Sequence, residues 1–263
     1  MQGYRSTGHR RRRLGGVVVA SLLTLINTFA VAQQAADSKP SATKSSALET
    51  LVYVPHDYDA PEVTEAGGVR AASQVEAKLP SLLVLAPPKL AATLSAQPRL
   101  YWYLSGPSTA PLRLTLLDFE GTSPEPLLEL ALDTAPAEGV YSASLAEHDV
   151  RLEPGRLYEW SVALEVDQEG YSNESVAKTI MAAKEADPAL LAQIADAPAL
   201  ARVEALAAAG YWYDAIDVIA QQIAADDSSQ PWRELRAKLL EQVGLQAVAT
   251  FERGGGTLDS PDR

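Results

Sequence analysis

The fold is decided by the stretch Leu152-Glu153-Pro154-Gly155-Arg156-Leu157-Tyr158-Glu159-Trp160-Ser161-Val162-Ala163-Leu164. Its Pro154-Gly155 pair predicts a tight turn. After the turn, large apolar residues occupy every second position: Tyr158, Trp160, Val162 and Leu164 alternate with Glu159, Ser161, Ala163 and Glu165. A period of two residues is typical of a β-strand with one buried face.

The same stretch resembles the corner before the sixth strand of fibronectin type III and immunoglobulin-like sandwiches. In those domains a tyrosine near the strand start bonds to the backbone a few residues upstream. The resemblance implies that the hydroxyl of Tyr158 holds the turn at Glu153 while its ring fills the core edge. The alternative is an ordinary hairpin that carries an aromatic residue.

Seven segments separated by turn residues are expected to be strands, a pattern typical of a β-sandwich. They are Ser81–Leu85, Arg99–Leu104, Leu112–Phe119, Leu127–Leu132, Gly139–Leu145, Leu157–Val166 and Glu174–Met181. Trp102 and Trp160 are expected in the core, where each buried ring contributes about 2–3 kcal/mol. The first fold prediction is therefore a mainly β, immunoglobulin-like sandwich over residues 80–183.

The hydrophobic period lengthens after residue 187. Asp187-Pro188 predicts a helix start, with the acid as N-cap and the proline in the first turn. Residues 208–216 resemble the middle of a single tetratricopeptide repeat, which is too little for a stable array. The second prediction is thus an all-α part at 187–250, a helical hairpin or three to four helices, followed by a disordered tail at 251–263.

The N-terminus carries the features of an export signal. Four arginines at 10–13 precede an apolar run at 17–31, and Ala30-Val31-Ala32 fits a cleavage site. The run is short for a membrane span, although an uncleaved anchor is the alternative. Residues 1–32 are therefore expected to be a signal peptide removed after Ala32, which makes the protein periplasmic or secreted without a stable span.

A disordered tether and an extended arm are expected over residues 33–79. The first part is rich in small and polar residues without an apolar period. Within the arm, Leu51–Pro55 is a short apolar patch that predicts an edge strand ended by its proline.

Composition limits the classes of function. The chain has no cysteine, which rules out disulfides and cysteine-ligated metal. The formal net charge of −12 includes five arginines of the signal, so the mature chain carries −17. Such a surface repels nucleic acid and anionic lipid, and no nucleic-acid partner is expected.

No catalytic residue, metal ligand or cofactor is predicted. The histidines outside the signal, His56 and His148, complete no hydrolase or metalloprotease motif. Residues 167–174 gather side-chain oxygens, so a calcium ion is an alternative there, but the spacing is not that of an EF-hand.

Two functional alternatives use other side chains. A hydrolase would rely on the carboxylates of Glu159, Glu165 or Asp167. A carbohydrate- or cell-wall-binding module would expose Tyr101 and Tyr103 on a sheet face.

Three consecutive aromatic residues, Tyr211, Trp212 and Tyr213, stand at a joint between two expected helices. One helix cannot bury three consecutive side chains on one face. They are expected either to pack between the helices and the sandwich or to bind a partner, since tryptophan and tyrosine dominate binding hot spots.

Several stretches in order resemble a bacterial family of exported, uncharacterised proteins, the domain-of-unknown-function family 928. They are residues 52–55, 61–70, 83–87, 97–104, 157–161 and 209–215. The resemblance implies export but no established activity and no catalytic residue. The expected function is a non-catalytic interaction or assembly module that contacts an unknown envelope protein.

Overall fold

The structure is a computed structural model that describes residues 51–56, 80–121, 125–132, 135, 137–168, 171–185, 187–226 and 229–254. Within these ranges, the side chains of 165–174 are not described. The expected signal at 1–32 and most of the tether at 33–79 lie outside the described residues, as do residues 255–263. The described residues belong to one compact unit, Ser41–Arg263.

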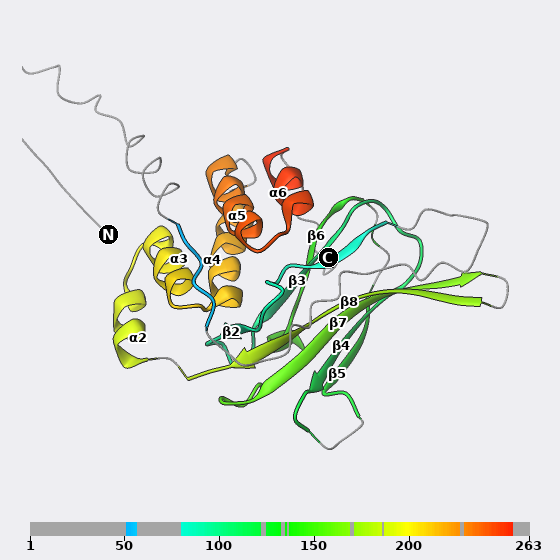
Figure 1. The fold of residues 1–263 in the computed structure, drawn as a ribbon, viewed down its shortest axis with the longest axis horizontal. Helices are drawn as coiled ribbons and strands as arrows, with labels where there is room; N and C mark the ends of the chain where they lie inside the picture. The colour runs from blue at the N-terminus through cyan, green and yellow to red at the C-terminus, as the bar shows by residue number, and fades with distance from the viewer. Residues whose placement is uncertain are drawn as a thin grey trace, which may run out of the picture. The chain divides into compact units, whose positions relative to one another are not determined.

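Two β-sheets form the first part of this unit (Figure 1). The smaller, antiparallel sheet has the order β1-β3-β6, from Leu82–Val84, Arg99–Leu104 and Gly139–Ser144. The larger sheet has the order β2-β8-β7-β4-β5, from Ala91–Thr93, Tyr171–Ala183, Leu157–Gln168, Leu112–Asp118 and Leu128–Leu132. Its neighbours are antiparallel except β2 and β8, which run parallel.

The seven predicted strands are confirmed, with ends that differ by up to three residues. Strand β2 was not predicted. Its three residues, Ala91–Thr93, show no alternation because all three side chains are buried. Their pairing with β8 defines the strand, and a pairing across ninety residues leaves no local signal.

The core lies where β1 of the smaller sheet contacts β7 and β8 of the larger one. The indoles of Trp102 and Trp160 are 1% and 0% exposed, as expected. Trp102 lies opposite Tyr141 in the β3–β6 register, and the two rings stack with centroids 6.3 Å apart. Large aromatic rings thus supply packing in a domain that has no disulfide.

The turn before β7 has the predicted geometry. Gly155 adopts φ +86°, which a side chain would strain, directly after Pro154. The backbone N–H of Glu153 donates to the hydroxyl oxygen of Tyr158 at 2.8 Å. This bond, inferred from the sequence, joins the turn to the buried ring of Tyr158.

Replacing Tyr158 with phenylalanine is expected to lower the free energy of unfolding by about 1 kcal/mol. The change keeps the ring and leaves the N–H of Glu153 without its acceptor. Urea denaturation measures the loss. The control is Glu153→Ala, which retains that N–H and removes only an exposed carboxylate paired with Arg156. A larger loss in the control would contradict the role given to the hydroxyl.

Five α-helices follow the strands: α2 (Pro188–Ala195), α3 (Ala199–Ala208), α4 (Trp212–Ala225), α5 (Gln230–Gln242) and α6 (Gln246–Arg253). The predicted hairpin or three to four helices is therefore corrected to five. The predicted cap is confirmed, because Asp187 Oδ1 accepts the N–H of Ala189 at 2.8 Å. A short 3-10 helix, η1 (Leu145–His148), follows β6.

Helix α6, which was not predicted as a separate helix, also corrects the expected start of the tail at 251, since it extends to Arg253. Its Glu252 is fully buried and accepts a hydrogen bond from the equally buried Arg236 of α5 at 2.7 Å. A guanidinium nitrogen of Arg233 lies 3.7 Å from the same carboxylate. This ion cluster, defined as Arg233, Arg236 and Glu252, ties the last helix to the core.

Candidate functional site

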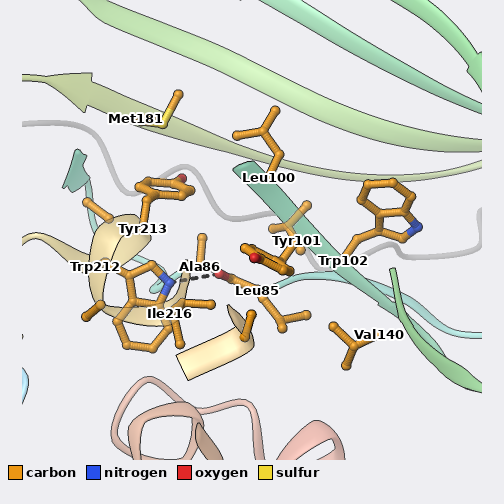
Figure 2. Packing of buried hydrophobic residues seen from close by; sticks show 14 of the residues in the cluster. Leu85, Ala86, Leu100, Tyr101, Trp102, Val140, Met181, Trp212, Tyr213 and Ile216 are labelled. Carbon is orange, nitrogen blue, oxygen red and sulfur yellow. Dashed lines mark hydrogen bonds between the residues drawn. The ribbon is translucent and has the colours of Figure 1, made fainter. Parts of the chain in front are cut away.

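The three consecutive aromatic residues lie where the helices meet the sheets. Tyr211, Trp212 and Tyr213 are 6%, 0% and 2% exposed. The indole N–H of Trp212 donates to the carbonyl of Leu85 at 2.8 Å, as Figure 2 shows. The hydroxyl of Tyr213 accepts a hydrogen bond from the indole N–H of Trp160 in β7 at 3.0 Å.

Of the two expected arrangements, the structure therefore has the packing between helices and sheets, with all three side chains buried. One helix does not have to bury all three side chains on one face, because α4 begins at Trp212 and Tyr211 precedes it as N-cap. Tyr211 lies after the turn at Gly210, and its hydroxyl is 3.5 Å from the carbonyl of Glu185. The three rings hold the helices on the sheets.

Asp214 strengthens the same junction from the first turn of α4. Its carboxylate accepts the backbone N–H of Leu94 at 2.9 Å, just after β2. The hydroxyl of Thr93 and the N–H of Ser95 also bond to it. Burial nevertheless raises the pKa of Asp214 to about 6, against the opposing effect of these bonds.

This raised pKa predicts a pH dependence. The protonated carboxyl is favoured in the folded protein, so its contribution is full below pH 3.8, the unfolded pKa, and is lost as pH rises through about 6. Relative to Asp214→Asn, which does not titrate, the wild type is expected to lose at most about 3 kcal/mol between pH 4 and 7. Urea denaturation at each pH measures the difference. A difference that stays constant with pH would contradict the assignment.

The tyrosines of β3 are not available to a carbohydrate. Tyr101 and Tyr103 are 4% and 3% exposed. The hydroxyl of Tyr101 donates to Asp217 of α4 at 2.7 Å, and that of Tyr103 donates to Glu138. Asp217 of α4 and Phe251 of α6 contact these two tyrosines, so the rings are not exposed on a sheet face as carbohydrate binding would require.

Of the three carboxylates considered for a hydrolase, only that of Glu159 belongs to the described side chains. Glu159 lies 3.6 Å from the ammonium of Lys178 on the neighbouring strand. The side chains of Glu165 and Asp167, like the loop proposed for calcium at 167–174, lie outside the described side chains. Among the described residues, no group of three histidines or acids is placed to hold a metal ion.

The segment Leu51–His56, here called the docked segment, is the most distinctive contact of the molecule. It was predicted as an edge strand, but it pairs with no sheet and lies against the helices (Figure 1). Its backbone is bound like that of a peptide. The N–H of Val54 donates to the carbonyl of Ala207 at 3.1 Å.

The side-chain amide of Gln242 binds the docked segment twice. Its Oε1 accepts the N–H of Tyr53 at 2.8 Å, and its Nε2 donates to the carbonyl of Leu51 at 3.1 Å. One amide therefore satisfies a donor and an acceptor of an extended backbone, as a neighbouring strand would. This explains why the segment forms no strand pairing although its sequence suits one.

Side chains of the docked segment alternate between the helices and solvent. Leu51 and Tyr53 are 5% and 7% exposed, whereas Val52 and Val54 are 56% and 50% exposed. The ring of Tyr53 meets the indole of Trp212 edge to face, with centroids 4.9 Å apart. The segment thus inserts every second side chain among the helices.

The end of the docked segment lies against the turn between α3 and α4. The ring of His56 meets that of Tyr211 at 5.3 Å. At Gly210, with φ +80°, an added Cβ would lie 2.7 Å from the ring of His56 and 2.9 Å from the carbonyl of Val54. Only glycine permits both the turn and this close approach. Burial, and next the charge of Lys184, lower the pKa of His56.

The docking site is defined here as Ala207, Gly210, Tyr211, Trp212 and Gln242. The sequence signalled Tyr211 and Trp212 as contact residues and left open whether they pack inside the protein or bind a partner. The sequence contained no signal for Gln242, because glutamine is a common residue near the end of a helix. Its role depends on a contact that spans 189 residues of sequence.

The described residues form two β-sheets followed by five C-terminal helices, and an extended segment of the same chain binds to these helices. The model of the family described as Domain of Unknown Function (DUF928) matches residues 65–252, and the chain belongs to this family. The matched range begins after the docked segment. A search of curated proteins found no match. No helix among the described residues is long and apolar enough to cross a membrane.

Proposed function

We propose that the protein is a non-catalytic interaction module of the bacterial envelope that binds an extended peptide at the docking site. The docked segment carries this proposal. Its main chain is bound through three hydrogen bonds, and only Leu51 and Tyr53 among its side chains from 51 to 54 are buried. Main-chain recognition gives affinity, and pockets for alternate side chains give specificity.

Export is part of the proposal. Arginines at 10–13, the apolar run and the cleavage pattern at Ala32 support a periplasmic or secreted protein. Intact mass of the protein recovered from the periplasm tests this. A chain that starts at Gln33 supports export with cleavage, and retention of residues 1–32 would show an anchor instead.

An immunoglobulin-like arrangement of the sheets also belongs to the proposal. Strands β1, β3 and β6 form one sheet, while β2, β4, β5, β7 and β8 lie in the other. This division supports the proposal, because immunoglobulin-like sandwiches separate strands A, B and E from C, F and G, and β1 and β2 can be taken as two halves of strand A. Two features support the tetratricopeptide-like interpretation of the helices. The connection between α3 and α4 is short, and the docked segment lies on the helices as a bound peptide would.

Peptide binding in trans tests the proposed function. The probe is a labelled synthetic peptide of residues 49–58, and the receptor is the full chain with Tyr53→Ala, which weakens its own segment. A segment of the same chain competes at an effective concentration of the order of millimolar. Fluorescence anisotropy is therefore expected to show at least tenfold tighter binding to the variant than to the wild type.

The matched control adds Gln242→Ala to the Tyr53→Ala receptor. The double variant loses the amide that binds the backbone of Leu51 and Tyr53, so binding is expected to fall at least tenfold. Circular dichroism establishes that both receptors are folded. A folded Tyr53→Ala receptor that does not bind the peptide would overturn the proposal.

A further inference from the structure

We infer that the docking site exchanges its occupant between two copies of this chain, so that the docked segment of one copy binds the helices of another. This inference rests on the proposed peptide-binding function. It goes further by identifying the partner as a second copy. The contacts, the length of the connecting chain and the exposed face of the segment each support it.

The hydrogen bonds and ring contacts described above for the docked segment all go to the helical part. Its hydrogen bonds go to Ala207 of α3 and Gln242 of α5, and its ring contacts go to Tyr211 and Trp212 at the start of α4. No strand supplies any of these contacts. A segment from a second copy would therefore meet the same groups, and exchange would leave their energy unchanged.

The connecting chain is long enough for exchange. Residues 57–79 join His56 to Pro80, and these 23 residues span at most about 75–80 Å when extended. A compact unit of this size has a radius of gyration of about 17 Å. The covalent connection therefore reaches the helices of an adjacent copy as well as those of its own.

The outer face of the segment offers additional contact. Val52 and Val54 are 56% and 50% exposed, side by side on the face turned away from the helices. Exchange is favoured over two closed monomers to the extent that the exchanged pair covers this apolar surface.

The protein concentration determines whether an exchanged pair can be detected. In the wild type, the chain's own segment competes at an effective concentration of the order of millimolar. The wild type is therefore expected to be monomeric at 100 µM. Exchange becomes detectable when neither chain can close on itself, and this condition can be built from two complementary variants.

The test mixes a segment-defective chain, Tyr53→Ala, with a site-defective chain, Gln242→Ala. Each keeps what the other lacks, so the intact segment of the second can bind the intact site of the first. Sedimentation equilibrium at 100 µM of each chain is expected to show a heterodimer only in the mixture. Both chains are first shown to be folded by circular dichroism, and Leu51→Asp is a second segment-defective variant.

A mixture that remains monomeric up to 1 mM would overturn the exchange. The peptide of residues 49–58 separates this failure from failure of the proposed function. If Tyr53→Ala binds the peptide but the mixture stays monomeric, the docking site binds peptides and exchange alone is wrong. If the peptide does not bind either, both proposals fail.

Discussion

Replacing Glu252 with glutamine is expected to lower the free energy of unfolding by about 3–5 kcal/mol. Glu252 and Arg236 have no exposed side-chain surface, and Arg233 is only 6% exposed. Without the carboxylate, two guanidinium groups remain in the core with no countercharge in this ion cluster. Removing one partner of a buried ion pair costs far more than the pair contributes, because the remaining charge stays desolvated.

Urea denaturation measures the effect, and Glu241→Gln is the matched control. Glu241 also pairs with an arginine, Arg253, but its side chain is 43% exposed. Exposed ion pairs contribute about 0–1 kcal/mol, so the control is expected to cost no more than that. If Glu252→Gln and Glu241→Gln lower the free energy of unfolding by the same amount, burial does not determine how much the ion cluster stabilises the fold.

A double replacement separates charge from packing. Arg236→Met with Glu252→Leu removes the shortest ion pair of the cluster and fills its volume with apolar atoms. Buried pairs replaced in this way often leave stability unchanged or higher. The double variant is expected to be more stable than Glu252→Gln alone. A larger loss in the double variant would show that the cluster stabilises the fold beyond pairing its own charges.

The predictable parts of the fold are those with local signals. Alternation or flanking turn residues marked every described strand except β2, and proline and glycine marked the turn before Tyr158 while Asp187-Pro188 marked the start of α2. Strand β2 and helix α6 were not predicted, because β2 is defined by pairing with β8 and α6 by the buried contact of Glu252 with Arg236. Neither contact has a counterpart in neighbouring sequence.

The candidate site was predictable only in part. Aromatic composition singled out Tyr211, Trp212 and Tyr213 as contact residues, and they are. It did not decide between internal packing and a partner contact, since composition does not record which surface covers a side chain. The apolar patch at Leu51–Pro55 was predicted as an edge strand, yet the segment lies on helices because Gln242 replaces a strand as its hydrogen-bonding partner.

Replacing Trp212 with alanine is expected to lower the free energy of unfolding by about 3–5 kcal/mol, the cost of truncating a fully buried tryptophan. Its indole is 0% exposed, donates to the carbonyl of Leu85 and contacts the ring of Tyr53. One side chain thus joins α4, the end of β1 and the docked segment. Its loss removes packing from all three at once.

The matched control is Trp232→Ala, since Trp232 of α5 is only partly buried at the edge of the core. Trp232→Ala is expected to lower the free energy of unfolding clearly less than Trp212→Ala, and equal losses would contradict the central position given to Trp212.

Binding of the 49–58 peptide to Tyr53→Ala supplies a second measurement. Adding Trp212→Phe to that receptor keeps a ring beneath the peptide and removes the bond to Leu85. Stability is then expected to fall by about 1–3 kcal/mol, while peptide affinity changes less than with Gln242→Ala, because Gln242 contacts the peptide backbone directly.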